Sequence, residues 1–322
     1  MSRFLLTGGG GFVGQWVARA LIQRGDDVTL AGLGSHVGGP AVLSTEEWRA
    51  VSWISANMRE QNDVNAMLDA SMPDVILHLA GVAFPPAADR DPASTYDINT
   101  LGIARLLAAV GVRRSAGIAD PAVLVVGSAT QYGAHDPGEM PLTEAAAQRP
   151  ATVYAASKAA QETIALRDFY ANGARVICTR SFNHSGVGHA GEYLLPSLVR
   201  RAKEMRARSR AEQAISIGND VTRDYLHVTD VGSAYIALAE RGRAGEAYNV
   251  CSGRGVTVRQ LATDVLLRAG VSPDISTDAS LSRTTDIPVL IGSPAKLMRD
   301  TGWAPQKTHA DIIDDLLNAP TD

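Results

Sequence analysis

Cysteine and aromatic residues are scarce in this 322-residue sequence, which contains 2 cysteines and is only 5% aromatic. Cys178 and Cys251 provide neither a disulfide framework nor a paired metal-ligand spacing, so we expect a reduced compartment and no metal. No apolar run approaches the roughly 20 residues that a membrane span requires. The apolar run Phe4–Leu6 is too short for the hydrophobic region of a signal peptide. These absences favour a cytoplasmic protein without membrane contact.

A strong excess of one charge is also absent, because 30 Lys and Arg residues accompany 34 Asp and Glu residues, giving a formal net charge of -4. Such a balance lacks the basic surface typical of proteins that bind nucleic acid or anionic membranes. The one basic cluster, within Arg200–Arg210, is interpreted as a solvated helix face. A small molecule is therefore the expected binding partner.

Apolar runs of strand length alternate with helical patterns in the first half of the chain. Strands are predicted at Arg3–Thr7, Val28–Ala31, Val75–Leu79 and Val123–Val126, with helices from about Gly11 and near Ile98–Val110. This alternation is typical of βαβ units, in which buried parallel strands are covered by helices on both faces. The sequence therefore predicts an α/β fold with a doubly wound parallel Rossmann sheet.

The alternation of strand and helix patterns becomes less regular from about Arg180, where glycine- and serine-containing loops surround one long charged segment. We expect residues 1–180 to form a dinucleotide-binding domain and residues 181–322 to form mainly a smaller α/β substrate lobe. Leu226–Leu238 again indicates a strand followed by a helix. We therefore expect the chain to return to the first domain at about residues 225–250.

Four consecutive glycines follow the first predicted strand, in the segment Thr7–Gly14 that opens the first predicted helix. Because glycine lacks a side chain, Gly8, Gly11 and Gly14 permit a tight turn and close approach of a pyrophosphate to backbone N–H groups. Phe12 and Val13 lie in the same loop. The strand before the glycines and the helix after them predict a dinucleotide site.

The second predicted strand ends without the acidic residue that often binds the ribose hydroxyls of NAD, because Gly32 occupies that place. No carboxylate would repel the 2′-phosphate of NADP, and Ser35 or His36 is positioned to donate a hydrogen bond to it. NADP(H) is therefore favoured, and NAD(H) is possible because no arginine accompanies these residues.

Tyr154 and Lys158 lie four residues apart in a predicted helix, which places the phenol and the ammonium on one face. Lys158 is expected to lower the Tyr154 pKa and to bind the nicotinamide ribose, leaving Tyr154 to exchange a proton with a carbinol or carbonyl oxygen. Ser128 follows a predicted strand upstream, at the sheet edge where ligands bind in open α/β folds. These three residues are the candidate catalytic group.

With these motifs the chain resembles, over nearly its whole length, the extended short-chain dehydrogenase/reductases, also called the NAD-dependent epimerase/dehydratase family. The motifs occur in the family's order: Thr7–Gly14, His78–Gly81, Asn99 in Asp97–Gly102, Ser128–Gly133, and Tyr154 with Lys158. The resemblance implies that Leu79, Ala80 and Gly81 run beside the cofactor. It also implies that Asn99 supports the active-site helix and that Asn57 and Met58 lie near the adenine.

The second half of the chain is similar to one subgroup of that family, the GDP-mannose 4,6-dehydratases and their partner 4-keto-6-deoxy-mannose reductases. The resemblance is carried by Arg180–Gly186, Arg223–Val231, Tyr248–Gly253 and Arg283–Gly292. It implies that the substrate is a nucleotide-linked sugar, with a GDP-linked one favoured, and that it contacts Ser128, Asn183, Arg223, Arg283 and Asp286.

Ala129 and Thr130 follow Ser128 at the positions where the dehydratases carry an acidic pair. Without carboxylates there, elimination of water from the sugar lacks proton-transfer groups. The expected reaction is therefore reduction of GDP-4-dehydro-6-deoxy-D-mannose to GDP-D-rhamnose. A nucleotide-sugar 4-epimerase is the alternative, and a non-catalytic dinucleotide sensor is disfavoured because the Tyr154–Lys158 pair is retained.

Two helices are expected to take part in assembly, near Ile98–Val110 and Tyr154–Tyr170. They carry apolar residues on more than one face: Leu101, Leu106, Leu107, Ile164 and Phe169. The resemblance implies that these helices pair with their copies in a four-helix bundle, giving a homodimer.

The segment Val82–Pro86 replaces a loop that is usually more polar and faces the sugar in this family. Its apolar character leaves the identity of the hexose open.

Overall fold

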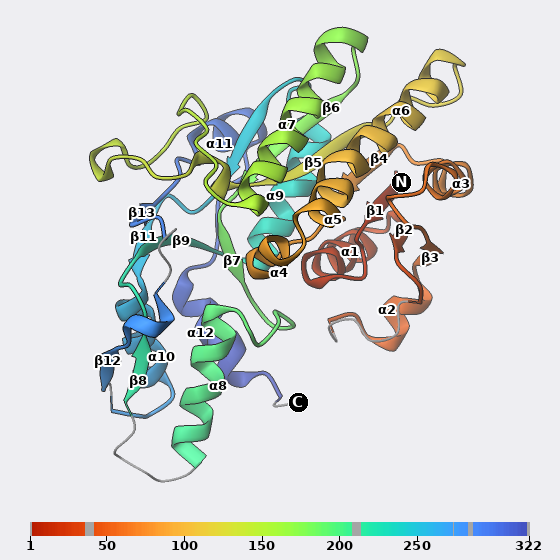
Figure 1. Cartoon of the computed structure of the whole chain (residues 1–322). Coiled ribbons are helices and arrows are strands. Elements are labelled where there is room, and N and C mark those ends of the chain that lie inside the picture. Colours follow the sequence, from red (N-terminus) through yellow and green to blue (C-terminus); the bar gives the residue numbers. More distant parts are fainter. Residues whose placement is uncertain (1, 36–41, 208–213, 273, 283–285, 321–322) are drawn as a thin grey trace.

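The structure is a computed structural model and describes residues 2–35, 42–207, 214–272, 274–282 and 286–320 (Figure 1). Its main sheet contains seven parallel strands in the order β10-β6-β5-β4-β1-β2-β3. These strands are β1 (Arg3–Thr7), β2 (Asp27–Gly32), β3 (Ser52–Ser55), β4 (Val75–His78), β5 (Ala122–Ser128), β6 (Val176–Ser181) and β10 (Ala247–Val250). The strand order reverses between β1 and β4, which confirms the doubly wound α/β prediction and defines the usual ligand crevice.

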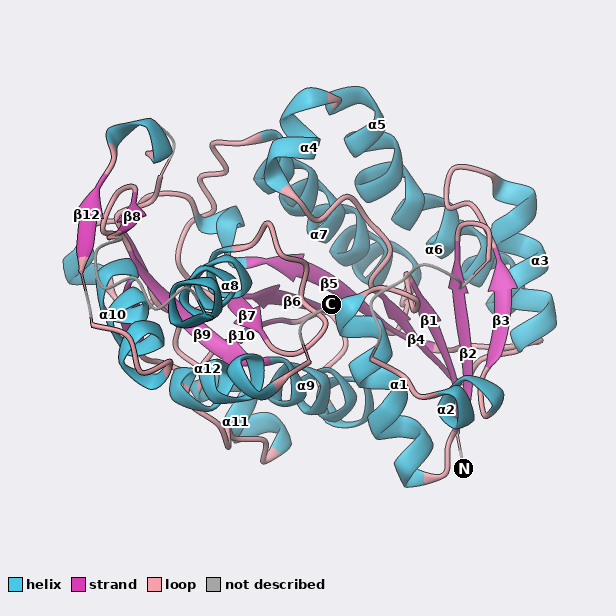
Figure 2. Ribbon diagram, turned by 90° about the horizontal axis from the view of Figure 1, so that it is seen from below, coloured by secondary structure: helices cyan, strands magenta, loops and turns pink. Residues whose placement is uncertain are grey.

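Helices cover both faces of this sheet (Figure 2). One face packs on α1 (Phe12–Arg24), α9 (Val228–Arg241) and α11 (Ala295–Thr301), and the other on α3 (Gln61–Ser71), α6 (Gly102–Ser115) and α7 (Val153–Asn172). Because side chains alternate along a strand, Phe4 and Leu6 enter the first core and Leu5 enters the second. None of the helices within the described ranges is long and apolar enough to cross a membrane.

Shorter helices connect the main elements. They are α2 (Thr45–Arg49), α4 (Pro85–Arg90), α5 (Pro92–Tyr96), the π-helix Asp97–Leu101, and three single 3₁₀ turns at Ala129–Tyr132, Pro137–Glu139 and Ala279–Leu281. The helix predicted near Ile98–Val110 is therefore one π turn that runs directly into α6. Such π turns occur frequently at functional sites, and this one contains Asn99.

The second half of the chain builds two small sheets and a separate apolar core. Strands β7 (Asn183–Ser185), β11 (Gly255–Thr257) and β13 (Val289–Leu290) all pair with β9 (Thr222–His227), while β8 (Ile215–Ile217) pairs with β12 (Ile275–Thr277). Helices α8 (Leu194–Ala207), α10 (Val258–Arg268) and α12 (His309–Asn318) cover this core, at the lower left of Figure 1. This part is the smaller α/β unit that the sequence predicted.

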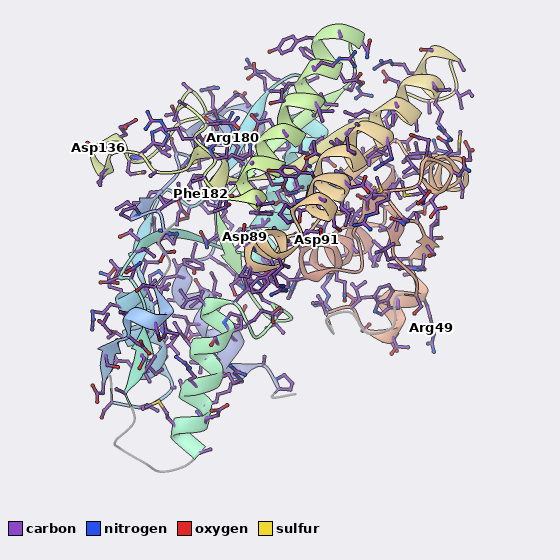
Figure 3. The ribbon with its side chains drawn as sticks, in the orientation of Figure 1. Arg49, Asp89, Asp91, Asp136, Arg180 and Phe182 are labelled. Atoms are coloured by element: carbon purple, nitrogen blue, oxygen red, sulfur yellow. The ribbon has the colours of Figure 1, made fainter. Side chains whose placement is uncertain are left out.

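The chain crosses between the two parts at several places within the described ranges. Strand β6 of the main sheet ends at Ser181, and β7 of the small sheet begins at Asn183, so Phe182 alone joins them (Figure 3). The predicted return at 225–250 is carried by α9 and β10, whereas β9 remains in the small sheet. The proposed division at residue 180 stays a prediction. The crossing places the small sheet beside the carboxyl edge of the main one.

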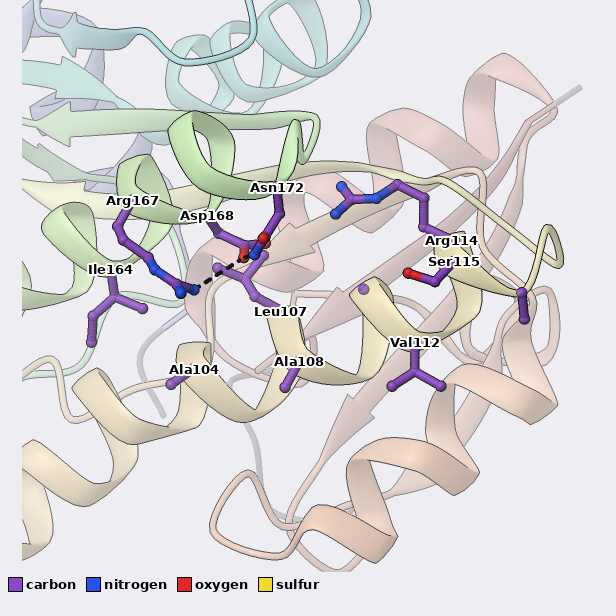
Figure 4. A pocket seen from close by; sticks show the side chains of 12 residues that line it. Ala104, Leu107, Ala108, Val112, Arg114, Ser115, Ile164, Arg167, Asp168 and Asn172 are labelled. Atoms are coloured by element: carbon purple, nitrogen blue, oxygen red, sulfur yellow. Dashed lines mark hydrogen bonds and ion pairs between the residues drawn. The ribbon is translucent and has the colours of Figure 1, made fainter.

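The outer faces of α6 and α7 border a groove lined by small and apolar residues (Figure 4). Leu101 is 48% exposed at the start of this surface, and Ile164 lines the groove. Leu106 is fully buried in the core beneath α6, so docking on the sheet already uses it. Leu107 also packs on that core but lines the groove, so its role in helix pairing stays a prediction.

Candidate active site

The glycine-rich loop is packed against main chain on two sides. Gly8 has a φ of +70°, and a Cβ atom added there would lie 2.7 Å from the amide nitrogen of Ala80. A Cβ atom at Gly14 would lie 2.6 Å from the carbonyl oxygen of Gly9. The amide of Gly11 donates to the carbonyl of Gly8 at 3.0 Å, which closes the turn. Only glycine fits at these positions without moving the backbone.

The start of α1 has the features of an anion site. Gly11 is its N-cap residue, no side chain caps the helix, and its first turn contains no acidic residue. The first amides of the helix and the positive end of its dipole therefore favour a diphosphate group. Together with the glycine cradle, this arrangement fits the pyrophosphate of a dinucleotide, which Gly8, Gly11 and Gly14 would hold.

The end of β4 lies directly against this loop. His78 is fully buried, and its Nδ1 atom lies 2.8 Å from the hydroxyl of Thr7, which also accepts from the amide of Ala80 at 3.4 Å. Burial, reinforced by nearby Lys158, lowers the pKa of His78 to about 3, so the ring is neutral at pH 7. Leu79, Ala80 and Gly81 thus follow β4 beside the glycines, as the family resemblance implies.

Asn99 joins the segment after β4 to helix α7. Its side chain accepts from the amide of Val82 at 2.7 Å and donates to the carbonyl of the same residue at 3.1 Å. It also donates to the hydroxyl of Ser157 at 2.9 Å, and this hydroxyl donates to the carbonyl of Tyr154. Asn99 therefore sets the distance between the loop after β4 and the helix that carries Tyr154 and Lys158.

The indole of Trp53 occupies the space beside Gly32, the position at which NAD-binding folds often carry an acidic residue. A Cβ atom at Gly32 would lie 2.9 Å from the indole of Trp53 and one at Gly10 would lie 3.1 Å from it, while the indole N–H donates to the carbonyl of Gly34 at 2.9 Å. Ser35 is exposed beside these residues. The other predicted donor, His36, lies outside the described residues.

The residues predicted near the adenine follow β3 and differ in their environments. Asn57 is partly buried, and its side-chain oxygen accepts from the amide of Arg59 at 3.1 Å. The side chain of Met58 packs into the core beside Gly102. Contacts of Asn57 and Met58 with the cofactor stay predictions.

Ser128 and Tyr154 come together at the carboxyl end of β5. Ser128 is the last residue of this strand, as predicted, and its hydroxyl lies 2.9 Å from that of Thr130. Tyr154 is in the first turn of α7, and its phenol is hydrogen-bonded to Ser128. A carbonyl oxygen placed between these two hydroxyl groups would meet two hydrogen-bond donors.

Two titratable groups of α7, those of Tyr154 and Lys158, have shifted pKa values in this environment. Desolvation raises the pKa of Tyr154 to about 12, although the hydrogen bond with Ser128 opposes this change. The expected lowering by Lys158 is absent from these interactions, since the Lys158 amine donates instead to the Val126 carbonyl at 2.9 Å and to Gln161 at 3.0 Å. Burial lowers the pKa of Lys158 to about 8.

A buried polar network that the sequence analysis did not identify supports the serine turn. Gln131 accepts from the amide of Ser128 at 2.8 Å and donates to the carboxylate of Glu162 at 2.9 Å. Arg180 forms a two-point ion pair with the same carboxylate, at 3.0 and 2.7 Å. Its guanidinium also donates to the hydroxyl of Tyr132 at 3.0 Å. The Ser128 turn, α7 and β6 are thereby tied together.

The sequence contained two signals for this network. Gln131 lies three residues after Ser128, which is the spacing of a capping box, and both of its bonds are present in the structure. Glu162 continues the four-residue spacing of Tyr154 and Lys158 on one face of α7. Neither signal identifies the third member, because only the folded sheet places Arg180 beside Glu162.

Two of the predicted substrate residues, Asn183 and Arg223, lie on strands of the small sheet. Asn183 is exposed on β7 and hydrogen-bonds Tyr225 of β9, whose phenol has a pKa raised to about 12 by burial. Arg223 of β9 donates to the carbonyl groups of Thr222 and Ile287, at 2.9 and 2.6 Å. The guanidinium of Arg223 therefore holds the segment before β13 in place.

Asp286 and Arg283 are the two further predicted substrate residues of this part of the chain. Asp286 accepts from the side chain of Asn219 at 2.9 Å and also interacts with Arg223 electrostatically. Arg283 lies outside the described residues. The structure thus brings Arg223 and Asp286 close together beside β9, and phosphate recognition by them stays a prediction.

Comparisons with known proteins agree with this geometry. A family model described as GDP-mannose 4,6 dehydratase matches residues 5–316. The GDP-6-deoxy-D-mannose reductase of Pseudomonas aeruginosa is 37% identical over 238 residues, 74% of this chain and 77% of that protein. The UDP-glucose 4-epimerase of Streptomyces lividans is 28% identical over 337 residues, 97% of this chain and 94% of that protein.

A solved structure of RMD from Pseudomonas aeruginosa, complexed with NADPH, has a TM-score of 0.81 and 30% identity, covering 98% of each chain. The chain belongs to the extended short-chain dehydrogenase/reductases, the NAD-dependent epimerase/dehydratase family. Within that family it falls in the group matched by the GDP-mannose 4,6 dehydratase model. The family resemblance found in the sequence is therefore confirmed, and with it an NAD(P)-dependent enzyme of nucleotide-sugar metabolism.

We predict that Gly14→Ala weakens NADPH binding at least about tenfold, a loss of about 1.4 kcal/mol. The reason is that its Cβ atom would press on the main chain of Gly9 and open the cradle. Gly111→Ala is the control, since a Cβ atom at Gly111 meets nothing within 4 Å. Fluorescence titration with NADPH measures both affinities. Equal affinity in the two variants would contradict the assigned cradle.

A second prediction concerns the charge of Lys158. Its pKa is about 8 in the folded protein against an ordinary value of 10.5, so between these values the unfolded chain retains a proton that the folded protein has lost. The contribution of Lys158 to the free energy of unfolding is therefore lowest below pH 8 and increases toward pH 10.5. The free energy of unfolding of the wild type minus that of Lys158→Met should rise from pH 7.5 to 9.5 in urea titrations. A constant difference would mean that the ammonium is not desolvated.

Proposed function

We propose that this protein is an NADPH-dependent reductase of the 4-keto group of a nucleotide-linked 6-deoxyhexose. The proposed reaction converts GDP-4-dehydro-6-deoxy-D-mannose to GDP-D-rhamnose. The observation that carries the proposal is a complete Ser128, Tyr154 and Lys158 group whose serine turn lacks carboxylates. The 37% identity to a GDP-6-deoxy-D-mannose reductase supports this choice of substrate.

The serine turn argues against dehydration. Ala129 is buried in an apolar cluster, and the hydroxyl of Thr130 is bound to that of Ser128. Loss of water from a 4-keto sugar requires one group that removes the C5 proton and another that protonates the leaving hydroxyl. Neither Ala129 nor Thr130 has a titratable group for these tasks, although the matching family model is named for a dehydratase.

In the proposed reaction the sugar C4 carbonyl oxygen lies between Tyr154 and Ser128. The bound dinucleotide supplies the hydride. Tyr154 donates its phenolic proton to the oxygen, and its raised pKa keeps this proton in place at neutral pH. The Ser128 hydroxyl donates a hydrogen bond to the same oxygen as negative charge develops there. Lys158, one helical turn from Tyr154, would hold the nicotinamide ribose.

NADP(H) is the proposed cofactor. The indole of Trp53 occupies the space that a side chain at Gly32 would need, which excludes the carboxylate typical of NAD-specific sites unless the indole moves. Ser35 remains the proposed donor to the 2′-phosphate. The related structure with bound NADPH is consistent with this preference.

The nucleotide end of the substrate is proposed to lie along the small sheet. Asn183 would contact the sugar diphosphate, and Arg223 with Arg283 would bind its phosphate oxygens, because guanidinium groups match phosphate geometry. Asp286, next to Arg223, would orient that guanidinium. A GDP-linked sugar is proposed on the basis of the similarity to the reductase.

Tyr154→Phe should reduce kcat by about a hundredfold or more and leave the Kd for NADPH within about twofold, since it removes a proton donor and little contact area. Stopped-flow absorbance and NADPH titration measure the two quantities. Tyr170→Phe is a matched control, because that phenol lies on the same helix, α7, and Tyr170 is 75% exposed. A kcat like that of the wild type in Tyr154→Phe would exclude the assignment.

The reductase and the 4-epimerase predict opposite cofactor stoichiometry. A reductase consumes one NADPH for each sugar and releases the oxidised form, whereas an epimerase must retain its cofactor through the cycle. We expect absorbance at the reduced-nicotinamide band to fall stoichiometrically with added GDP-4-dehydro-6-deoxy-D-mannose. Inversion of a 4-hydroxy sugar nucleotide without added reductant would instead establish the epimerase.

A homodimer is proposed through the outer faces of α6 and α7. Ala104, Ala108, Gly111 and Ser115 line the groove from α6 at helical spacing, and Val112 is 69% exposed there. Small residues permit close approach of a second helix pair, which would complete a four-helix bundle.

Sedimentation velocity at micromolar concentration should give the mass of a dimer, and Ala108→Arg should shift it to the monomer because a charged side chain would be forced into the helix interface. Arg167→Ala, at the exposed rim of the same groove, should leave the dimer intact. A wild type that sediments only as a monomer would contradict the proposed assembly.

A further inference from the structure

Four aromatic rings from separate segments form one continuous chain of contacts. The rings of Phe12 and His189 are stacked, with centroids 4.6 Å apart and planes within 5°. The ring of Tyr193 lies 4.2 Å from that of His189 and meets Phe84 edge to face at 5.4 Å. These four side chains, called the aromatic wall below, link the start of α1 to the loop after β4 and to the segment before α8.

The aromatic wall stands beside the proton donor. Asn99 ties Val82, two residues before Phe84, to Ser157 of α7, and the phenol of Tyr193 contributes to the raised pKa of Tyr154. Phe84 is the N-cap residue of α4, and α4 packs on α7, the helix that carries Tyr154. Asp89, which is labelled in Figure 3, marks α4 at the centre of the molecule.

The wall is also held firmly in place. The hydroxyl of Ser185 lies 3.0 Å from Nδ1 of His189, and the indole of Trp16 donates to the carbonyl of Val187 at 2.9 Å. These bonds fix the segment between β7 and α8 against α1. A fixed wall discriminates between ligands better than a mobile one, because it does not reorganise around the wrong group.

The position of the wall limits which part of a sugar it can contact. If C4 lies within hydrogen-bond distance of Tyr154, the groups nearest to it are the C3 hydroxyl and the C6 group carried by C5. Phe84 has no hydrogen-bonding atom, and its neighbours Val82 and Ala83 are apolar as well. A hydroxyl facing these side chains would lose water without gaining a partner, whereas a methyl group would gain apolar contact.

We propose that Phe84 and Tyr193 select 6-deoxy sugars by packing against the C6 methyl group. This inference rests on the proposed function, because it assumes that C4 of a nucleotide sugar lies beside Tyr154. It adds the part of the site that distinguishes the 6-deoxy sugar from its 6-hydroxy parent. The loop Val82–Pro86, whose apolar character left the hexose open in the sequence, thereby acquires a specific role.

Two ligands that differ by one hydroxyl group test this directly. Isothermal titration calorimetry on the NADP⁺-saturated protein compares GDP-6-deoxy-D-mannose with GDP-D-mannose, and dTDP-6-deoxy-D-glucose with dTDP-D-glucose. We expect the 6-deoxy member of the bound pair to bind at least about fivefold more tightly, the low end of the range for an unpaired hydroxyl.

Phe84→Ser should reduce that preference to less than about twofold, since its hydroxyl can pair with the sugar's. Phe84→Leu should retain the preference, because it preserves an apolar surface. Tyr193→Phe should also retain it, since the ring and not the phenol hydroxyl makes the contact. NADPH affinity, measured on every variant, identifies any variant that has not folded.

The outcomes separate this inference from the proposed function. A preference seen only in the dTDP pair, with no binding of either GDP sugar, would overturn the proposed base and support the aromatic wall. Equal affinities within the pair, or a preference that survives in Phe84→Ser, would overturn the role of the wall, whether or not the reductase assay succeeds. Binding of no sugar nucleotide would overturn both.

Discussion

The carboxylate of Glu162 links the helix that carries Tyr154 and Lys158 to the turn that begins at Ser128 and to strand β6. It receives Gln131 from the serine turn and Arg180 from β6, all of them nearly excluded from solvent. Removing one partner from such a buried pair typically costs 3–5 kcal/mol, because the other charge is left without compensation. The relative position of the two hydroxyl groups in the site depends on this interaction.

Around that fixed centre, the fold supplies two different kinds of surface. The main sheet offers main-chain groups at the glycine loop, where Gly8 and Gly14 leave no space for side chains. The small sheet offers side chains such as Asn183 and Arg223, and Phe182 is the single residue between its strand β7 and strand β6 of the main sheet. In the proposed assignment, the backbone of the glycine loop would hold the cofactor and side chains of the small sheet would hold the substrate.

Much of this arrangement was predictable from local sequence. Periodicity located β1, β4 and β5, and the spacing of Tyr154 and Lys158 placed them on one helix face. Contacts between distant segments were not predictable: Trp53 over Gly32, Arg180 on Glu162, and Tyr193 against Phe84 are set by strand order and loop packing. Leu106 shows the same limit, since an apolar helical residue does not reveal whether it faces its own sheet or a second subunit.

The central claim is that the site formed by Ser128, Tyr154 and Lys158 catalyses one net hydride transfer from NADPH to C4 of the sugar. Reaction of 4-deuterated NADPH, labelled on the transferring face, with GDP-4-dehydro-6-deoxy-D-mannose tests it, with the product followed by NMR. The account predicts one deuterium at C4 of the product for each cofactor oxidised, and release of the oxidised cofactor. Deuterium at C6, or label that remains on a tightly held cofactor while the sugar is inverted, would contradict it.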